Sequence, residues 1–198
     1  TRETGNYVVT AVTFNLSRRK APVVTYRELQ ERLAGIALPT LAQVRDAVIA
    51  IRAGKGALIR QGYDSFKCAG SFFKNPVVSR GHFEQVEALV AGEGEASRWY
   101  WPLPGGEVKV SAAFLIQRAG FRRGHARGNV GISPHHALIL INRGGATARE
   151  IVGFAGEVQR RVLERFGVLL LPEARLIGFG ASPLQVERRI QVLPISAL

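Results

Sequence analysis

The sequence contains no Met and only one Cys, Cys68. A single Cys forms no internal disulfide and cannot build a Cys-based structural zinc site, so a reducing cytoplasm is the expected compartment. No apolar run approaches the ~20 residues that a membrane-spanning helix needs, and the N-terminus has no basic-then-apolar signal pattern. We therefore expect no membrane partner. Because the chain opens on Thr1, we also expect it to be a portion of a longer protein.

Acidic residues are also scarce. The 198 residues include 15 acidic and 27 basic side chains, which give a net charge of +12, and 22 of the basic residues are Arg. An anionic partner explains this balance, because guanidinium groups bind phosphate or carboxylate through paired hydrogen bonds. A solvated surface in a protein from an Arg-preferring organism explains it equally well. The 46% hydrophobic and 21% charged residues are typical of one globular domain or two small ones.

Several common catalytic motifs are absent. The sequence has no Walker phosphate loop, no dinucleotide-binding glycine pattern after a strand, no His-Glu-x-x-His and no Gly-x-Ser-x-Gly. The adjacent pair His135 and His136 is a weak metal signal, because neighbouring residues in a strand point to opposite faces. We therefore expect no metal site.

Helix start signals recur along the chain. Capping boxes, in which Ser or Thr precedes Glu or Gln by three residues, predict helices near residues 25, 40 and 147. Ser79 and Ser111 are candidate N-caps of two further helices. The helix after Thr147 is the longest and most amphipathic, and Gly167 is expected to end it.

Apolar alternation predicts a half-buried strand over residues 7–16, and a Pro-Gly-Gly turn predicts a hairpin of residues 99–103 and 107–110. Apolar runs at 136–142 and 168–171 are typical of buried strands. Residues 55–78 are expected to form a loop and a short strand, and residues 121–131 a basic glycine-rich loop. The prediction is an α+β fold, with small mixed or antiparallel sheets and packed helices.

Four features are candidates for chemistry. The loop at 70–76 presents Ser71 and Asn75 around two Phe residues, and Glu173 follows a proline at the end of an apolar run. An arginine-rich loop and Lys55, which lies just past a helix end, are candidate phosphate contacts. Ordinary structural explanations compete with each: a turn, a solvated strand end, a solvated loop and a favourable helix-dipole contact. The basic loop residues are Arg118, Arg122, Arg123, His125 and Arg127.

The segment 69–76, Ala-Gly-Ser-Phe-Phe-Lys-Asn-Pro, resembles the signature of the UDP-N-acetylenolpyruvoylglucosamine reductases, flavoenzymes of peptidoglycan precursor synthesis also called UDP-N-acetylmuramate dehydrogenases. Segments 52–56, 108–116, 136–142 and 172–178 are similar to later motifs of that family, in the same order. The resemblance extends over nearly the whole chain, and the Phe-Phe motif is its most specific part.

The resemblance implies a division of the chain. Residues 1–54 are expected to be the C-terminal end of an FAD-binding domain, 55–166 the substrate-binding domain, and 167–198 a segment that returns to the flavin-binding region. The first part of the flavin-binding domain is expected to lie outside this chain. The implied reaction uses NADPH and FAD to reduce UDP-N-acetylglucosamine enolpyruvate to UDP-N-acetylmuramate.

The resemblance also assigns roles to individual residues. Ser71 matches the serine that protonates the substrate carbon next to the one that accepts hydride, and Glu173 matches the carboxyl group that helps to stabilise the enol-like intermediate. Lys55 or Lys74 is a candidate cation that assists Ser71. The residues matched to contacts with the UDP-sugar, including a Tyr or Trp that stacks on uracil, are Lys55, Asn75, Tyr100, Trp101, Arg123 and His136.

Two other classes stay open. A nucleic-acid-binding module needs Arg and aromatic residues interleaved on one exposed face. The acidic residues of the predicted helices and the lack of a known nucleic-acid-binding motif disfavour it. A non-catalytic relative that kept the scaffold is the third class, and intact Ser71 and Glu173 argue against it. The sequence predicts nothing about oligomeric state.

Overall fold

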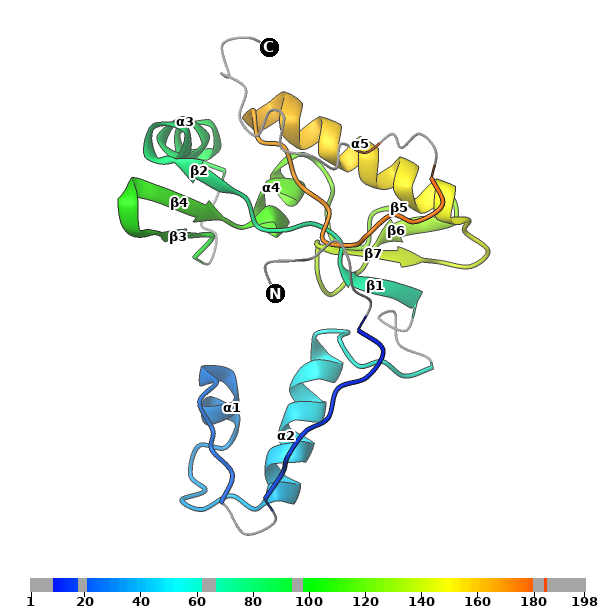
Figure 1. The fold of residues 1–198 in the computed structure, drawn as a ribbon. Coiled ribbons are helices and arrows are strands. Elements are labelled where there is room, and N and C mark those ends of the chain that lie inside the picture. Colours follow the sequence, from blue (N-terminus) through cyan, green and yellow to red (C-terminus); the bar gives the residue numbers. More distant parts are fainter. Residues whose placement is uncertain (1–8, 18–20, 62–66, 94–97, 180–183, 185–198) are drawn as a thin grey trace. The chain divides into compact units, whose positions relative to one another are not determined.

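The structure, a computed structural model, describes residues 9–17, 21–61, 67–93, 98–179 and 184 (Figure 1). The chain divides into two compact units, residues 1–51 and 52–198. The first unit is built on two helices. The second contains two sheets and three helices, and it holds all the residues that the sequence singles out for chemistry.

The first unit contains α1 (Arg27–Arg32) and most of α2 (Leu41–Gly54). Leu29 and Leu33 bury their side chains against Ala47 of α2. The predicted capping box at the start of α2 is confirmed, because the Thr40 N–H donates to Gln43 Oε1 at 2.9 Å and the Gln43 N–H donates to Thr40 Oγ1 at 3.3 Å. These bonds satisfy two backbone donors that a helix start leaves open.

Two predictions for the first unit are wrong. The short helix predicted near residue 25 is present as α1, but it begins after Tyr26 without a side-chain cap, so the predicted capping box at Thr25 is wrong. Residues 9–16 of the predicted 7–16 strand have no regular secondary structure, and Val12, Phe14 and Leu16 are 65%, 76% and 83% exposed. Alternation marks a strand only where a neighbouring strand pairs with it, and no strand of the described chain does so. Residues 7 and 8 lie outside the described ranges.

The second unit contains a four-stranded and a three-stranded sheet, and every strand pair in them is antiparallel. The four-stranded sheet has the order β1 (Cys68–Ser71), β7 (Ile139–Asn142), β6 (Val130–Ile132) and β5 (Ala126–Arg127). The three-stranded sheet has the order β2 (Val77–Ser79), β4 (Glu107–Val110) and β3 (Tyr100–Pro102). The predicted hairpin is thus confirmed as β3 and β4, joined by a short 3₁₀ turn, Pro104–Gly106.

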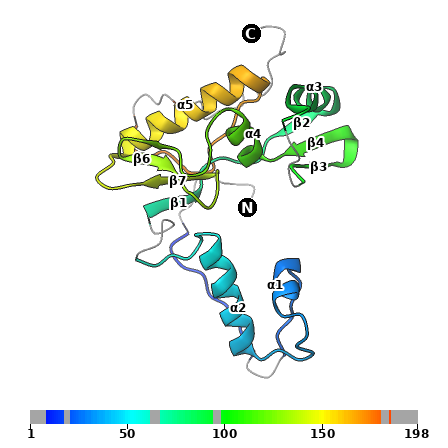
Figure 2. The same cartoon turned by 180° about the vertical axis from the view of Figure 1, so that it is seen from behind.

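Three helices cover these sheets: α3 (Arg80–Val90), α4 (Ala112–Arg118) and α5 (Ala148–Phe166). Figures 1 and 2 show α3 along the three-stranded sheet, α5 along the four-stranded sheet, and α4 between the two sheets. The predicted caps Ser79, Ser111 and Thr147 each accept a bond from a backbone N–H of the first turn. The predicted α+β class is confirmed. None of the helices in the described ranges is long and apolar enough to cross a bilayer.

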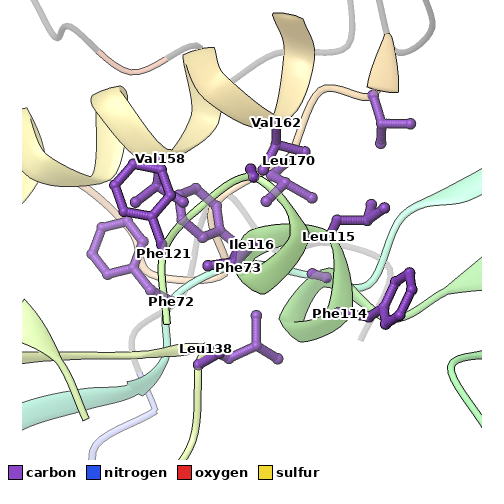
Figure 3. Packing of buried hydrophobic residues seen from close by; sticks show 14 of the residues in the cluster. Phe72, Phe73, Phe114, Leu115, Ile116, Phe121, Leu138, Val158, Val162 and Leu170 are labelled. Carbon is purple, nitrogen blue, oxygen red and sulfur yellow. The ribbon is translucent and has the colours of Figure 1, made fainter. Parts of the chain in front are cut away.

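The core of the second unit forms where α4 and α5 meet the loop after β1 (Figure 3). Leu115 and Ile116 of α4, Val158 of α5, and Phe73 are all fully buried. The neighbouring Phe72 is 5% exposed and meets the Phe73 ring edge-on, with 5.1 Å between the ring centroids. Because two large side chains anchor this loop, the residues on either side of them, Ser71 and Lys74, have a fixed position.

Three further predictions need correction. The basic loop at 121–131 contains the short strands β5 and β6, which pair through Arg127 and Val130. The strand predicted at 136–142 begins at Ile139. Residues 168–171 form no strand. Val168 is a single bridge residue, Leu169 and Leu170 are buried coil, and an isolated bridge joins Phe73 to Pro172. A short apolar run shows burial but does not by itself show a ladder partner.

Candidate active site and basic pocket

A β-bulge sets the position of Ser71. Strand β1 pairs with β7 at Cys68–Ile141 and at Ser71–Ile139, so β1 has one residue more than β7 between these pairs. Gly70 lies in this interval with φ +79°, a conformation that costs a side chain energy. The bulge turns the end of β1. The ladder then continues as the Phe72 N–H donates to the Leu138 carbonyl at 2.8 Å.

Glu173 is held beside Ser71 by the backbone. The Lys74 N–H donates to the Leu171 carbonyl at 2.9 Å, and the Glu173 N–H donates to the Phe72 carbonyl at 2.8 Å. These bonds flank the bridge between Phe73 and Pro172. Two segments about 100 residues apart in sequence therefore run side by side, and Glu173 is fixed to the residue that follows Ser71.

Ser71 and Glu173 line one open cavity of about 300 Å³, together with Asn75 and two cations, Lys74 and Lys109. Phe73 and Leu138 complete its wall. The cavity thus combines a hydroxyl, a carboxyl, an amide and two ammonium groups. Such a set can bind a carboxylate, and it can transfer a proton to a carbon that carries developing negative charge.

The side chain of Asn75 is partly committed to the fold. Its Oδ1 accepts a hydrogen bond from the Ala112 N–H at 2.9 Å, at the first residue of α4. The acceptor end of the amide is therefore in use, and its NH₂ group is the end that can serve a ligand in the cavity.

Lys109 is a cavity residue that the sequence interpretation did not select. It lies on β4 directly opposite Val77 on one side and Trp101 on the other, so these three side chains share a sheet face. Its neighbours Val108 and Val110 are buried on the other face. The alternation Glu-Val-Lys-Val from 107 to 110 carries this information, because buried Val residues at every second position leave Lys109 outside.

The register also separates the two candidate aromatic residues. Trp101 lies opposite Lys109, on the face that borders the cavity with Ser71. Tyr100 lies opposite the buried Val110 and packs on Phe83 of α3, with 4.5 Å between the ring centroids. The structure thus brings Trp101, but not Tyr100, to the Lys109 side of the sheet.

A second and larger pocket, of about 1010 Å³, is strongly basic. Arg123 and His136 line it, as do Arg98, Arg118 and Arg122. Its aromatic wall is a stacked pair, Trp99 and Phe114, with 4.3 Å between ring centroids and 15° between planes. The remaining lining residues are Ser111, Ala113, Gln117 and Pro134. We refer to this site as the basic pocket.

His136 faces the basic pocket as a neutral ring. Its Nδ1 accepts a hydrogen bond from the Leu138 N–H at 3.2 Å, which places the ring proton on Nε2. Partial loss of water around the ring, followed by the charges of Arg123 and Lys55, lowers the pKa of His136 below its ordinary value of 6.5. At neutral pH His136 therefore offers a hydrogen-bond donor without adding a positive charge.

Lys55 does not line either pocket, but its charge is close enough to His136 to contribute to the lowering of the His136 pKa. Its loop is fitted closely to the turn that carries His136. A Cβ on Gly56, which has φ +63°, would approach the ring of His135 to 2.5 Å.

The predicted basic loop is divided by the fold. Arg118, Arg122 and Arg123 line the basic pocket, whereas Arg127 forms an ion pair with Glu157 of α5. His125 stacks on Phe154, with 6.0 Å between the ring centroids. Among the described residues, no group of three or more His, Cys, Asp or Glu side chains is arranged to hold a metal ion.

Residues 61–177 match the family model described as the C-terminal domain of UDP-N-acetylenolpyruvoylglucosamine reductase. Proteins named UDP-N-acetylenolpyruvoylglucosamine reductase are similar over most of the chain. The protein from Thermobifida fusca is 42% identical over 178 residues, covering 87% of this chain and 50% of its own. Those from Cupriavidus pinatubonensis and Mycolicibacterium smegmatis are 41% and 40% identical, covering 84% and 86% of this chain and 47% and 49% of their own. The chain thus spans about half the length of these relatives.

Proposed function

The chain belongs to the UDP-N-acetylenolpyruvoylglucosamine reductase family, and on this premise we propose that it binds the UDP-sugar and supplies the proton donor of a flavin-dependent reductase. The reaction converts UDP-N-acetylglucosamine enolpyruvate to UDP-N-acetylmuramate, in the synthesis of peptidoglycan precursors. One observation carries the proposal: Ser71 and Glu173, from distant parts of the sequence, line one cavity with Asn75, Lys74 and Lys109.

In this proposal the cavity with Ser71 holds the enolpyruvyl end of the substrate. Hydride adds to the terminal carbon of the enolpyruvyl double bond, and negative charge develops on the neighbouring carbon and its carboxylate. Ser71 donates the proton to that neighbouring carbon, and the electron pair of the O–H bond stays on its oxygen. A serine hydroxyl is a poor acid in water, so this transfer requires cations that stabilise the resulting alkoxide.

Lys74 and Lys109 are the cations that line this cavity, and they perform that role here. The carboxyl group of Glu173 helps to stabilise the enol-like intermediate. Asn75 donates its NH₂ to the substrate, since its Oδ1 is bonded to α4.

The basic pocket binds the diphosphate in this proposal, and the uracil lies outside the pocket lining, against Trp101. Arg122 and Arg123 match the charge and the planar oxygens of a diphosphate, and the neutral His136 donates from Nε2. Trp101 is the candidate for stacking on uracil, with Lys55 near His136 as a further cation. Both pockets border the first turn of α4: Ser111 lines one, and Asn75 of the other bonds to Ala112.

The reaction implies FAD, and the exposed backbone of β1 at Gly70 leaves room for its flavin ring. Strand β1 presents Gly70 and Ser71 as exposed residues, and the space where a Cβ on Gly70 would lie has no atom within 4 Å. A flat ring can therefore approach the strand beside Ser71. When bound, FAD reduced by NADPH supplies the hydride. We propose that residues 1–54 and 167–198 belong to the flavin-binding part and 55–166 to the substrate-binding part.

The proposed setting is the cytoplasm, where the nucleotide-sugar substrate and NADPH are found. The alternatives are a nucleic-acid-binding module and a scaffold without catalysis. Binding of a UDP-sugar in preference to single-stranded DNA would exclude the nucleic-acid-binding module. Turnover by the flavin-loaded protein would exclude the scaffold without catalysis.

The test is Ser71→Ala in a protein that contains this chain together with the flavin-binding part and is loaded with FAD. We expect NADPH-dependent reduction of the flavin at the rate of the unmodified protein, and substrate reduction slowed by about 10²- to 10⁴-fold, the usual contribution of a positioned general acid. Ser79→Ala is the matched control, because Ser79 caps α3 outside both pockets. Full turnover by Ser71→Ala would refute the assignment.

A further inference from the structure

The basic pocket contains one arginine that the fold holds in place. Arg118, the last residue of α4, lines the pocket with its side chain only 22% exposed. Its guanidinium carbon lies 5.2 Å from the centroid of the Phe114 ring, and Phe114 stacks on Trp99. Figure 3 shows Phe114 apart from the group formed by Phe72, Phe73 and Phe121. Trp99, Phe114 and Arg118 thus form a column along one wall of the pocket.

Glu93 holds the other side of this arginine. Nη1 of Arg118 donates to the Glu93 carbonyl at 2.5 Å and lies 3.3 Å from Glu93 Oε2. Arg165 of α5 donates to the second carboxylate oxygen, Glu93 Oε1, and to the carbonyl of Arg118. Glu93 therefore bridges two arginines. Each arginine also donates to a backbone carbonyl: Arg118 to that of Glu93, shortly after α3, and Arg165 to that of Arg118, the last residue of α4.

This arrangement restricts Arg118 from three sides. The Phe114 ring holds one face of the guanidinium, the carboxylate and carbonyl of Glu93 hold an edge, and Arg165 fixes the backbone at Arg118. An arginine side chain with many rotamers loses conformational freedom when it binds a phosphate. One that is already ordered loses less, and it therefore binds more tightly for the same contact.

We propose that Glu93 is a positioning residue for the basic pocket, which orders Arg118 so that its guanidinium meets the diphosphate of the UDP-sugar. This inference rests on the proposed function, because it takes its ligand from there. Glu93 acts through Arg118 and needs no contact with the ligand.

The sign of the effect separates positioning from simple electrostatics. A carboxylate near an anion site repels the anion, so removing its charge tightens binding if Glu93 is merely a nearby charge. If Glu93 positions Arg118, removing the charge weakens binding. We expect Glu93→Gln to raise the dissociation constant for UDP about five- to tenfold, the cost of ordering one long side chain on binding.

The experiment measures UDP binding by calorimetry to the 198-residue chain, to Glu93→Gln, to Arg118→Gln and to the double variant. We expect the Glu93→Gln effect to disappear in the Arg118→Gln background, which a general loss of stability does not produce. Glu164→Gln is the matched control: Glu164 pairs with Arg160 on the exposed face of α5, and its loss leaves UDP affinity unchanged. Arg165→Gln, which removes only the second arm, is expected to weaken binding less, and it tests the idea if Glu93→Gln does not fold.

The outcomes separate the proposed ligand of the basic pocket from the proposed role of Glu93. If UDP does not bind to the unmodified chain, the ligand of the basic pocket is wrong, and the proposed function fails together with this inference. If UDP binds to the unmodified chain but Glu93→Gln binds it equally or more tightly, only the role of Glu93 is overturned. An effect of Glu93→Gln that persists undiminished beside Arg118→Gln also overturns it.

Discussion

Substitution of Asn75 by Asp separates the two atoms of its amide. In the structure Oδ1 accepts from the Ala112 N–H at 2.9 Å, where Ala112 is fully buried, and the NH₂ group remains for the cavity that contains Ser71. Asn75→Asp keeps an acceptor for the helix and replaces the donor with a negative charge. Asn75→Ala removes both groups. The two variants therefore test one structural and one functional bond independently.

The expected stability changes follow from the buried donor. Without Oδ1, the Ala112 N–H loses its partner, and an unsatisfied buried donor costs about 1–3 kcal/mol. For a chain of this size each kcal/mol lowers Tm by about 2–4 °C, so Asn75→Ala is expected to melt about 2–12 °C lower. Asn75→Asp keeps the bond and should melt within about 2 °C of the unmodified chain, since its loss is smaller than about 0.5 kcal/mol.

The expected affinities run differently. Asn75→Asp places a carboxylate against an anionic substrate, so we expect the dissociation constant for UDP-N-acetylglucosamine enolpyruvate to rise at least about tenfold, or about 1.4 kcal/mol. Melting by circular dichroism and binding by calorimetry measure the two effects on the same samples. The reasoning is refuted if Asn75→Asp loses as much stability as Asn75→Ala, or if it binds the substrate as tightly as the unmodified chain.

Three further predictions concern His136, two glycines and a helix cap. Because the pKa of His136 is lowered in the folded state, the unfolded chain binds the proton first as the pH falls, and the free energy of unfolding decreases below about pH 6.5. Urea unfolding at pH 7.5 and 5.5 should show a smaller decrease in this free energy for His136→Gln than for the unmodified chain. Gly56→Ala and Gly70→Ala both place a side chain at positive φ, costing about 1–2 kcal/mol, but only Gly56→Ala also meets the His135 ring and should lower Tm more; equal losses would contradict the contact. Thr147→Ala should cost about 1 kcal/mol and Thr147→Ser almost nothing, measured by thermal melting, because Thr147 and Glu150 form the capping box of α5.

Local chemistry made much of the fold predictable. The hydroxyls of Thr40, Ser79, Ser111 and Thr147 each bond to the first turn of the helix they were expected to start, because a cap is decided within four residues. Thr25 has the same pattern but does not cap α1, since the helix begins one residue later and the Leu29 and Gln30 N–H groups donate to the Tyr26 carbonyl. Strands are less local: residues 9–16 alternate correctly but pair with no described strand, and residues 168–170 are buried without a ladder.

The candidate site shows the same limit. The anchoring of the 70–76 loop by Phe72 and Phe73 was predictable, because two adjacent aromatic side chains after a glycine require a core. Only the family resemblance predicts that Ser71 and Glu173 share a site, since no local rule connects segments about 100 residues apart. The contact between Glu93 and Arg165, 72 residues apart, left no sequence pattern at all.

The arginine excess has two explanations at the level of the sequence, a solvated surface and an anionic partner, and the structure contains residues of both kinds. Arg27, Arg80 and Arg160 pair with glutamates one turn away on exposed helix faces, where such pairs contribute only tenths of a kcal/mol. Arg122 and Arg123 instead lie in the basic pocket and have no acidic partner within ion-pair distance among the described residues. Two adjacent arginines that repel each other are unfavourable unless an anion offsets the repulsion. Net charge alone therefore does not indicate an anion site, whereas the location of Arg122 and Arg123, which lack an acidic partner among the described residues, supports the proposed one.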